Sequence, residues 1–141
     1  MLTDISRVRL IPLKTHTDPR GNLTAIEGES DLPFSIQRLF YVYGVTSGDE
    51  RAGHAHPDTE QCLIAIHGAL DVNVRSPQDE RSFHLDDPRT GLYVPPMLWV
   101  RLYNFTPGAV CLAAASTHYE PERVLRDWGE YTRRMSETAG Q

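Results

Sequence analysis

Residues 48–61 read Gly-Asp-Glu-Arg-Ala-Gly-His-Ala-His-Pro-Asp-Thr-Glu-Gln, and this stretch is the most informative part of the chain. It places His54 and His56 two positions apart, and Glu60 follows with three residues between. On an extended strand, residues at i and i+2 point to the same face. If that face is the interior of a barrel, both imidazoles share one pocket. The stretch therefore predicts a strand that carries a histidine pair.

The segments on both sides of this stretch are short apolar runs separated by Gly, Pro, Asn and Asp. This pattern is typical of many antiparallel strands joined by turns. Turns are expected at residues 18–21, 47–49, 67–68, 76–77 and 106–108, where breakers supply a fixed or positive φ. Strands are expected within residues 8–13, 22–27, 34–45, 60–68, 69–76, 81–85, 91–96, 98–105 and 109–116.

An all-β chain with this many strands must close or double its sheet to hide its edges, which favours a jelly-roll barrel. Only the end of the chain departs from the strand pattern. Between Glu120 and Met135, apolar residues recur at helical spacing, which predicts a short C-terminal helix. We therefore expect one all-β jelly-roll domain spanning residues 1–141, closed by that helix.

Bulk properties exclude several classes of function. A formal net charge of -5 disfavours binding to nucleic acid, which needs a basic face. No apolar run approaches the roughly 20 residues of a membrane span, and the N-terminal residues lack the features of a secretory signal, so a cytoplasmic protein is expected. Cys62 and Cys111 each lie in an apolar run and predict buried free thiols.

The spacing G-x5-H-x-H-x3-E formed by Gly48, His54, His56 and Glu60 is similar to the first signature of the cupin superfamily, whose members commonly bind a divalent metal there. The second cupin signature normally adds a histidine four residues before an asparagine. Here Val100 stands four residues before Asn104, and an aliphatic side chain cannot bind a metal. We expect no catalytic metal, and Glu60 is expected to orient a histidine.

The chain as a whole, up to about Tyr131, resembles the cupin family of sugar 3,4-ketoisomerases that act on thymidine-diphosphate (TDP) linked 4-keto-6-deoxyglucose. The matching pieces are Asp18-x-Arg20-Gly21-x-Leu23, Leu32-Pro33-Phe34-x-Ile36-x-Arg38-x-Phe40-Tyr41, Arg51-x-Gly53-His54-Ala55-His56, Glu60-Gln61, Gly91-Leu92-Tyr93-Val94-x-Pro96-x-x-Trp99 and Tyr119 with Arg126-Asp127. The chain departs from the family pattern at Pro57, where relatives tend to carry lysine, and at Val100.

The resemblance implies a jelly-roll homodimer that binds a TDP-linked 4-keto-6-deoxy sugar without metal or other cofactor. A base removes the proton from carbon 3, which the neighbouring ketone acidifies, and an acid returns a proton to carbon 4 of an enediol. Histidine suits both steps, since its unperturbed pKa is about 6.5. A 3-keto product would normally pass to an aminotransferase.

The same resemblance suggests the site residues. His54 is expected to be the principal base, His56 its partner, and the Tyr41 hydroxyl a donor to the enediolate. Arg51 is expected to bind the diphosphate, since guanidinium groups pair bidentately with phosphate. Secondary expectations are phosphate contacts from Arg38 and Arg101, and stacking on the thymine or sugar by Trp99, Tyr93 and Tyr43.

Three other functions compete with this interpretation, because cupins host many activities. A metal-dependent oxygenase would need the missing fourth ligand or bound iron. A sugar 3,5-epimerase also uses a cupin barrel, a nucleotide sugar and a histidine base, although it should show a separate His-Asp dyad. The non-enzymatic alternative is a cupin that binds the nucleotide sugar without turnover.

Overall fold

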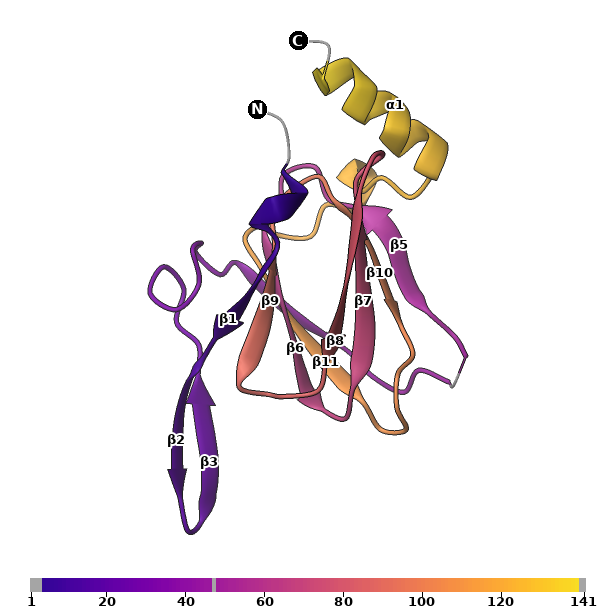
Figure 1. Ribbon diagram of the computed structural model, residues 1–141. Coiled ribbons are helices and arrows are strands. Elements are labelled where there is room, and N and C mark those ends of the chain that lie inside the picture. Colours follow the sequence, from indigo (N-terminus) through magenta and orange to yellow (C-terminus); the bar gives the residue numbers. More distant parts are fainter. Residues whose placement is uncertain (1–3, 47, 140–141) are drawn as a thin grey trace.

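The computed structural model describes residues 4–46 and 48–139, with the side chains of residues 52, 138 and 139 left out. Two antiparallel sheets face each other (Figure 1). The first has the order β1 (Arg9–Pro12), β9 (Thr90–Val94), β6 (Gln61–His67), β11 (Val110–Ala115) and β4 (Arg38–Val42). The second has the order β5 (Arg51–Ala55), β10 (Trp99–Tyr103), β7 (Leu70–Arg75) and β8 (Glu80–Leu85).

The main hydrophobic core fills the space between these sheets. Alternate residues of each strand point inward, as the two-residue period of a strand requires. From the first sheet come Leu63, Leu92 and Ala113, and from the second come Val72 and Val100, all buried in one cluster. The predicted all-β barrel is confirmed. The strand predicted at the histidine pair is β5, which contains His54 and ends one residue before His56.

A two-stranded hairpin, β2 (Lys14–Asp18) and β3 (Gly21–Ala25), belongs to neither sheet and projects from the barrel (Figure 1). The predicted turn at residues 18–21 joins its strands, with Asp18 opposite Gly21. Gly21 has a φ of 137°, a conformation that other residues rarely adopt. A 3-10 turn, η1 (Ile5–Arg7), precedes β1.

The C-terminal helix begins later than predicted. Helix α1 covers Trp128–Ala139, whereas Pro121–Arg123 form only a 3-10 turn, η2. Between them, Leu125 pairs with Ala55 of β5 as an isolated antiparallel bridge. The backbone N–H of each residue donates to the carbonyl oxygen of the other, at 2.9 Å in both cases. This pairing keeps Leu125 extended, so the helix begins only after it. In the part of the chain that the structure describes, no helix is long and apolar enough to cross a membrane.

Helix α1 covers the outer side of the four-stranded sheet near Trp99. Its buried residues Tyr131 and Met135 pack with Ala55, Trp99 and Leu125 in a separate apolar cluster. The Tyr131 hydroxyl donates to the carbonyl oxygens of Met97 and Arg75, at 3.0 and 3.2 Å. The helix therefore fixes the segment that joins it to the barrel.

Candidate active site

A cavity of about 420 Å³ lies between β4, β5 and the segment that follows β11. It is lined by Arg38, Phe40, Arg51, His54, His56, Tyr119, Val124 and Arg126. The predicted histidine pair and the predicted Arg38 and Arg51 thus meet in one place. Since none of these eight residues is acidic, the cavity carries an excess of positive charge.

The direction of His54 follows from its position on β5. It lies opposite Val100 of β10, and Val100 is buried in the main core. Cross-strand neighbours share a face, so His54 faces the interior. The register of the two strands shifts after Val100, and Gly53 has a φ of 87° at this irregularity. The bulge and its glycine set the direction in which the following histidines point.

The bridge between Ala55 and Leu125 adds a second wall beside the histidines. Ala55 and Leu125 both pack in the outer cluster beneath α1. Alternation along an extended chain therefore directs their neighbours to the opposite face, and these neighbours are His54, His56, Val124 and Arg126. All four line the cavity.

The two imidazoles contact each other edge to face, with ring centroids 4.7 Å apart. Burial is the main cause that lowers the pKa of His54 from 6.5 to about 4, and the positive charge of Arg126 adds to it. Burial also lowers the pKa of His56 to about 4, with contributions from His54, Arg38 and Arg126. Both rings are therefore neutral at pH 7, the state in which an imidazole accepts a proton.

The arginine of β4 is held by aromatic rings. The Arg38 guanidinium carbon lies 5.1 Å from the ring centroid of Phe40 and 5.1 Å from that of Tyr119. Its Nε atom is buried and has no hydrogen-bond partner among the described residues. A partly desolvated guanidinium with a free donor is suited to an anionic ligand.

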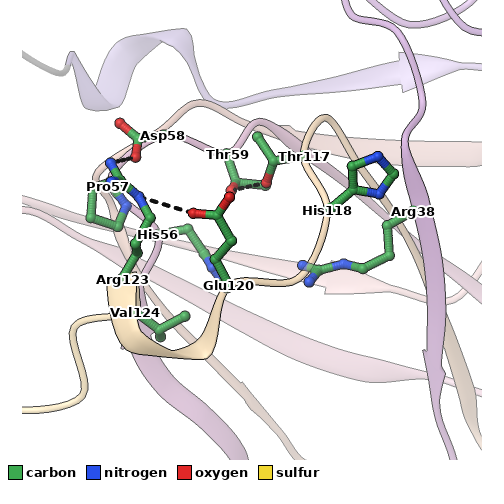
Figure 2. A pocket seen from close by; sticks show the side chains of 10 residues that line it. All are labelled: Arg38, His56, Pro57, Asp58, Thr59, Thr117, His118, Glu120, Arg123 and Val124. Atoms are coloured by element: carbon green, nitrogen blue, oxygen red, sulfur yellow. Dashed lines mark hydrogen bonds and ion pairs between the residues drawn. The ribbon is translucent and has the colours of Figure 1, made fainter.

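A second lobe of about 250 Å³ continues from the cavity past Arg38, His56 and Val124 (Figure 2). Its wall is polar, and its groups are largely paired with one another. Arg123 forms ion pairs with Asp58 and Glu120. The hydroxyl groups of Thr59 and Thr117 lie 2.6 Å apart and share a hydrogen bond. The charge of this lobe is thus balanced, unlike that of the histidine cavity.

A third lobe of about 230 Å³ extends from His54 and Phe40 into the barrel, where Gln61, Leu63 and Val100 line it. The Nε2 atom of Gln61 is buried and lacks a partner among the described residues. Gln61 is therefore the polar group that faces the interior at the start of β6.

The expectation that Glu60 orients a histidine is not supported by its contacts. Its Oε1 accepts a hydrogen bond from the Tyr93 hydroxyl at 2.6 Å. Tyr93 belongs to a cluster with Cys62 and Phe34 on the outer side of the five-stranded sheet. Glu60 and Tyr93 thus lie on the side of β6 away from the histidines, because adjacent strand residues alternate. Within residues 4–46 and 48–139, no group of three or more His, Cys, Asp or Glu could hold a metal.

Tyr41 and Tyr43 are placed differently from the expectation. Inward-facing Phe40 and Val42 pack against the main core, so the alternating residues Tyr41 and Tyr43 point outward. Tyr41 and Tyr43 are 62% and 67% exposed, and their ring centroids lie 5.6 Å apart. Tyr41 forms part of the wall of the inner lobe, but its ring lies on the outer face of the sheet.

Trp99 and Arg101 also lie outside the cavity, on the outer face of β10. Trp99 packs against Trp128 and Tyr131, with ring centroids 5.3 and 5.5 Å away. Arg101 forms an ion pair with Glu50 at 2.8 Å. The structure thus gives Trp99 a packing role beneath α1 and leaves Arg101 neutralised on the surface.

Four cavity residues were given no site role from the sequence, namely Phe40, Tyr119, Val124 and Arg126, although all but Val124 stand in the pieces that match the family. The interpretation of residues 120–135 as one helix hid the extended segment that carries the last two. The local sequence gives no clear signal for this segment, because Val124 and Leu125 are consecutive apolar residues and do not alternate with polar ones.

Comparison with known proteins supports the resemblance. The family model FdtA, described as WxcM-like, C-terminal, matches residues 6–136. The TDP-4-oxo-6-deoxy-alpha-D-glucose-3,4-oxoisomerase of Aneurinibacillus thermoaerophilus is 32% identical over 123 residues, covering 87% of this chain and 88% of that protein.

Solved structures agree with this relationship. A histidine-to-asparagine variant of the 3,4-ketoisomerase QdtA from Thermoanaerobacterium thermosaccharolyticum, in complex with TDP-4-keto-6-deoxyglucose, is 33% identical with a TM-score of 0.91, covering 95% of this chain and 97% of that one. The TDP-quinovose 3,4-ketoisomerase WlaRB from Campylobacter jejuni is 31% identical with a TM-score of 0.87, covering 92% and 99%. The chain therefore belongs to the FdtA family of WxcM-like proteins.

Proposed function

We propose that this protein is a sugar 3,4-ketoisomerase that converts a TDP-linked 4-keto-6-deoxyglucose into the corresponding 3-keto sugar. The observation that carries the proposal is the pair of neutral histidines, with ring centroids 4.7 Å apart, in a cavity whose formal charges are all positive. The relatives named above carry the same activity in their names.

The reaction relocates protons and needs no external oxidant or reductant. A proton leaves carbon 3, and the electron pair forms a double bond to carbon 4 while negative charge develops on oxygen 4. Oxygen 4 takes up a proton to give the enediol, oxygen 3 then loses its own proton and becomes the ketone, and carbon 4 receives a proton. Histidine side chains perform this kind of general acid–base transfer.

His54 is proposed as the base at carbon 3, and His56 as its partner in proton transfer. Both lie in the cavity and are neutral near pH 7. A bound diphosphate would neutralise the surrounding guanidinium charge and raise the pKa of each imidazole, since an opposite charge nearby favours the protonated form. Substrate binding thereby makes each histidine a stronger base than it is in the empty cavity.

Arg38 and Arg51 are proposed to bind the diphosphate. Both line the histidine cavity, and neither forms an ion pair with a carboxylate among the described residues. Arg101 does not share this role, since it is paired with Glu50 outside the cavity. The geometry likewise gives no catalytic role to Tyr41 or stacking role to Trp99, whose rings lie on outer faces of the sheets.

We also propose that two copies of the chain associate. Leu39 and Tyr41 are 61% and 62% exposed on β4, the last strand of its sheet, and Tyr43, which follows β4 directly, is 67% exposed. Hairpin β2–β3 projects from the barrel, with Leu23 60% exposed. Exposed apolar edges and isolated hairpins are stable when another surface covers them. A second copy supplies both surfaces at once.

Two further expectations complete the proposal. Cys62 and Cys111 are both buried and free, which is compatible with the reducing cytoplasm. The ketone at carbon 3 of the product is the group that an aminotransferase would use in the following reaction.

The test separates turnover from binding. The protein is mixed with TDP-4-keto-6-deoxyglucose after treatment with a chelator, and the product is identified by NMR. Calorimetry with TDP alone measures binding. We expect a 3-keto product and measurable TDP binding. Binding without any product would favour the non-enzymatic cupin, and inversion at carbons 3 and 5 with the ketone still at carbon 4 would favour the epimerase.

A further inference from the structure

We propose that Arg126 is a catalytic residue whose guanidinium binds oxygens 3 and 4 of the enediolate intermediate. This inference rests on the proposed ketoisomerase reaction. It separates Arg126 from Arg38 and Arg51, which are proposed to bind the diphosphate.

The first argument is the position of Arg126 relative to the base. The bridge pairs Leu125 with Ala55 in antiparallel fashion. In such a pair, the residue after Leu125 lies across from the residue before Ala55, so Arg126 is the cross-strand neighbour of His54. Arg126 therefore stands beside the proton acceptor, where the reacting carbons must lie.

The second argument is that the backbone on both sides of Arg126 is fixed. Leu125 exchanges two hydrogen bonds of 2.9 Å with Ala55. Asp127 caps helix α1, because its Oδ2 accepts a hydrogen bond of 2.8 Å from the Glu130 amide. A guanidinium on such a segment is aimed before substrate arrives, which is the condition for electrostatic stabilisation of a transition state.

The third argument is that Arg126 has no carboxylate partner among the described residues, although arginines near it do. Arg123 pairs with Asp58 and Glu120, and Arg133 pairs with Glu137 at 2.8 Å. Arg126 instead faces a cavity without any acidic lining residue. Its charge acts on the histidines, since it contributes to the lowered pKa of both His54 and His56.

The chemistry of the intermediate matches this group. In the enediolate, oxygens 3 and 4 are attached to the two carbons of one double bond in the sugar ring. Both oxygens therefore lie in the plane of that bond, on the same side of it. A guanidinium offers two parallel N–H donors in a plane, which suits a pair of coplanar oxygens. Negative charge develops on oxygen 4 as the proton leaves carbon 3. Negative charge on oxygen 3 disappears later, as the ketone forms there. One bidentate donor serves both stages.

The test compares Arg126→Gln and Arg126→Lys with Arg133→Gln, a control on the exposed surface of α1. We expect Arg126→Gln to lower kcat about 100-fold to 1000-fold, as loss of one oxyanion donor does, with KM and the affinity for TDP changed less than about threefold. Arg126→Lys should recover part of kcat, and the control should match the wild type. A raised KM with unchanged kcat would overturn the proposal and assign Arg126 to ground-state binding.

A second readout does not depend on turnover. The pKa values of His54 and His56 are measured by NMR of the imidazole nitrogens in the substrate-free protein. The charged or titratable groups that line the cavity with them are Arg38 from β4, Arg51 from β5, and Tyr119 and Arg126 from the segment after β11. Loss of the Arg126 charge should raise both pKa values from about 4, and the control should not. If both values stay unchanged in a folded Arg126→Gln protein, Arg126 does not lie beside the histidines and the proposal fails, whatever reaction the wild type catalyses.

Discussion

At the scale of single residues, the proposed chemistry depends on two imidazoles that burial and nearby guanidinium groups keep neutral. Both histidines have a pKa lowered from 6.5 to about 4 in the empty cavity. A base must be deprotonated to act, so its activity is present above its pKa and lost as the pH falls through it. An enzyme that uses histidine as a base usually loses activity as the pH falls through the unperturbed pKa of histidine. Here the loss should occur at a lower pH.

The pH dependence of kcat/KM tests this environment, because it reports groups of the free enzyme. We expect kcat/KM to remain constant from pH 7 downward and to decline only as the pH approaches about 4. The acid limit of kcat should lie at higher pH, since the bound diphosphate raises the pKa of the histidines. Circular dichroism at each pH controls for unfolding. An acid limit of kcat/KM near 6.5 would mean that the imidazoles are not desolvated as the structure has them.

Diphosphate binding is tested at Arg51. We expect Arg51→Gln to weaken TDP binding at least about tenfold, because a charge-assisted bidentate contact is lost. Arg101→Gln serves as the matched control, since Arg101 is paired with Glu50 outside the cavity. Titration calorimetry at constant salt measures both. Equal affinities for the two variants would place the diphosphate elsewhere.

At the scale of elements, the short extended segment 124–126 and helix α1 act together, since α1 anchors the segment that completes the cavity. Tyr131 illustrates this anchoring. Its hydroxyl donates to two backbone carbonyl oxygens, while its ring is buried against Trp99. It contributes to stability and stays remote from the proposed chemistry.

Replacement of Tyr131 by Phe should therefore separate stability from activity. We expect Tyr131→Phe to lower the free energy of unfolding by about 1–2 kcal/mol, because buried carbonyl groups lose their donor. Below the unfolding temperature, kcat should change less than about threefold, as the backbone bonds between Ala55 and Leu125 remain. Urea unfolding and steady-state kinetics measure the two effects. A large loss of kcat with unchanged stability would contradict this division of roles.

The sequence alone predicts those elements whose residue pattern is local. Alternating apolar runs and breakers predicted the barrel, and the spacing of His54 and His56 predicted one shared face. The start of α1 could not be predicted in this way, because a long-range pairing between Leu125 and Ala55 overrides the helical spacing of residues 120–127. The same pairing brings Arg126 to the histidines, so the missed boundary and the missed residue have one cause.

The orientation of individual side chains also could not be predicted from the sequence. The resemblance suggested roles for Tyr41, Trp99 and Arg101, and the cupin signature suggested one for Glu60. Trp99, Arg101 and Glu60 make their contacts outside the cavity, and the Tyr41 ring is exposed on the outer face of β4. Predicting this required knowing which face of each strand is inside. Apolar residues occupy both faces of β4 and β10, so the period of two does not reveal the inner one. The extent of a single domain over residues 1–141 stays a prediction.

At the scale of the whole molecule, the projecting hairpin and the exposed edge of β4 are the surfaces that a second copy is proposed to cover. We expect sedimentation analysis to give twice the chain mass of 15.9 kDa. The double variant Leu39→Glu and Tyr43→Glu should shift the protein toward a monomer, because charges at an apolar interface are costly to bury. Glu29→Lys, at an exposed position outside both surfaces, controls for a change in surface charge. A monomeric wild type would refute the proposed association.

The central claim is that His54 moves a proton between carbons 3 and 4, and its most direct test is proton NMR of the reaction in deuterated water. Chelator-treated wild type and His54→Asn are each mixed with TDP-4-keto-6-deoxyglucose. The account predicts a 3-keto product that carries solvent deuterium at carbon 4 for the wild type, and a loss of this conversion in the variant. A ketone that remains at carbon 4 with the wild type, or equal conversion by His54→Asn, would contradict it.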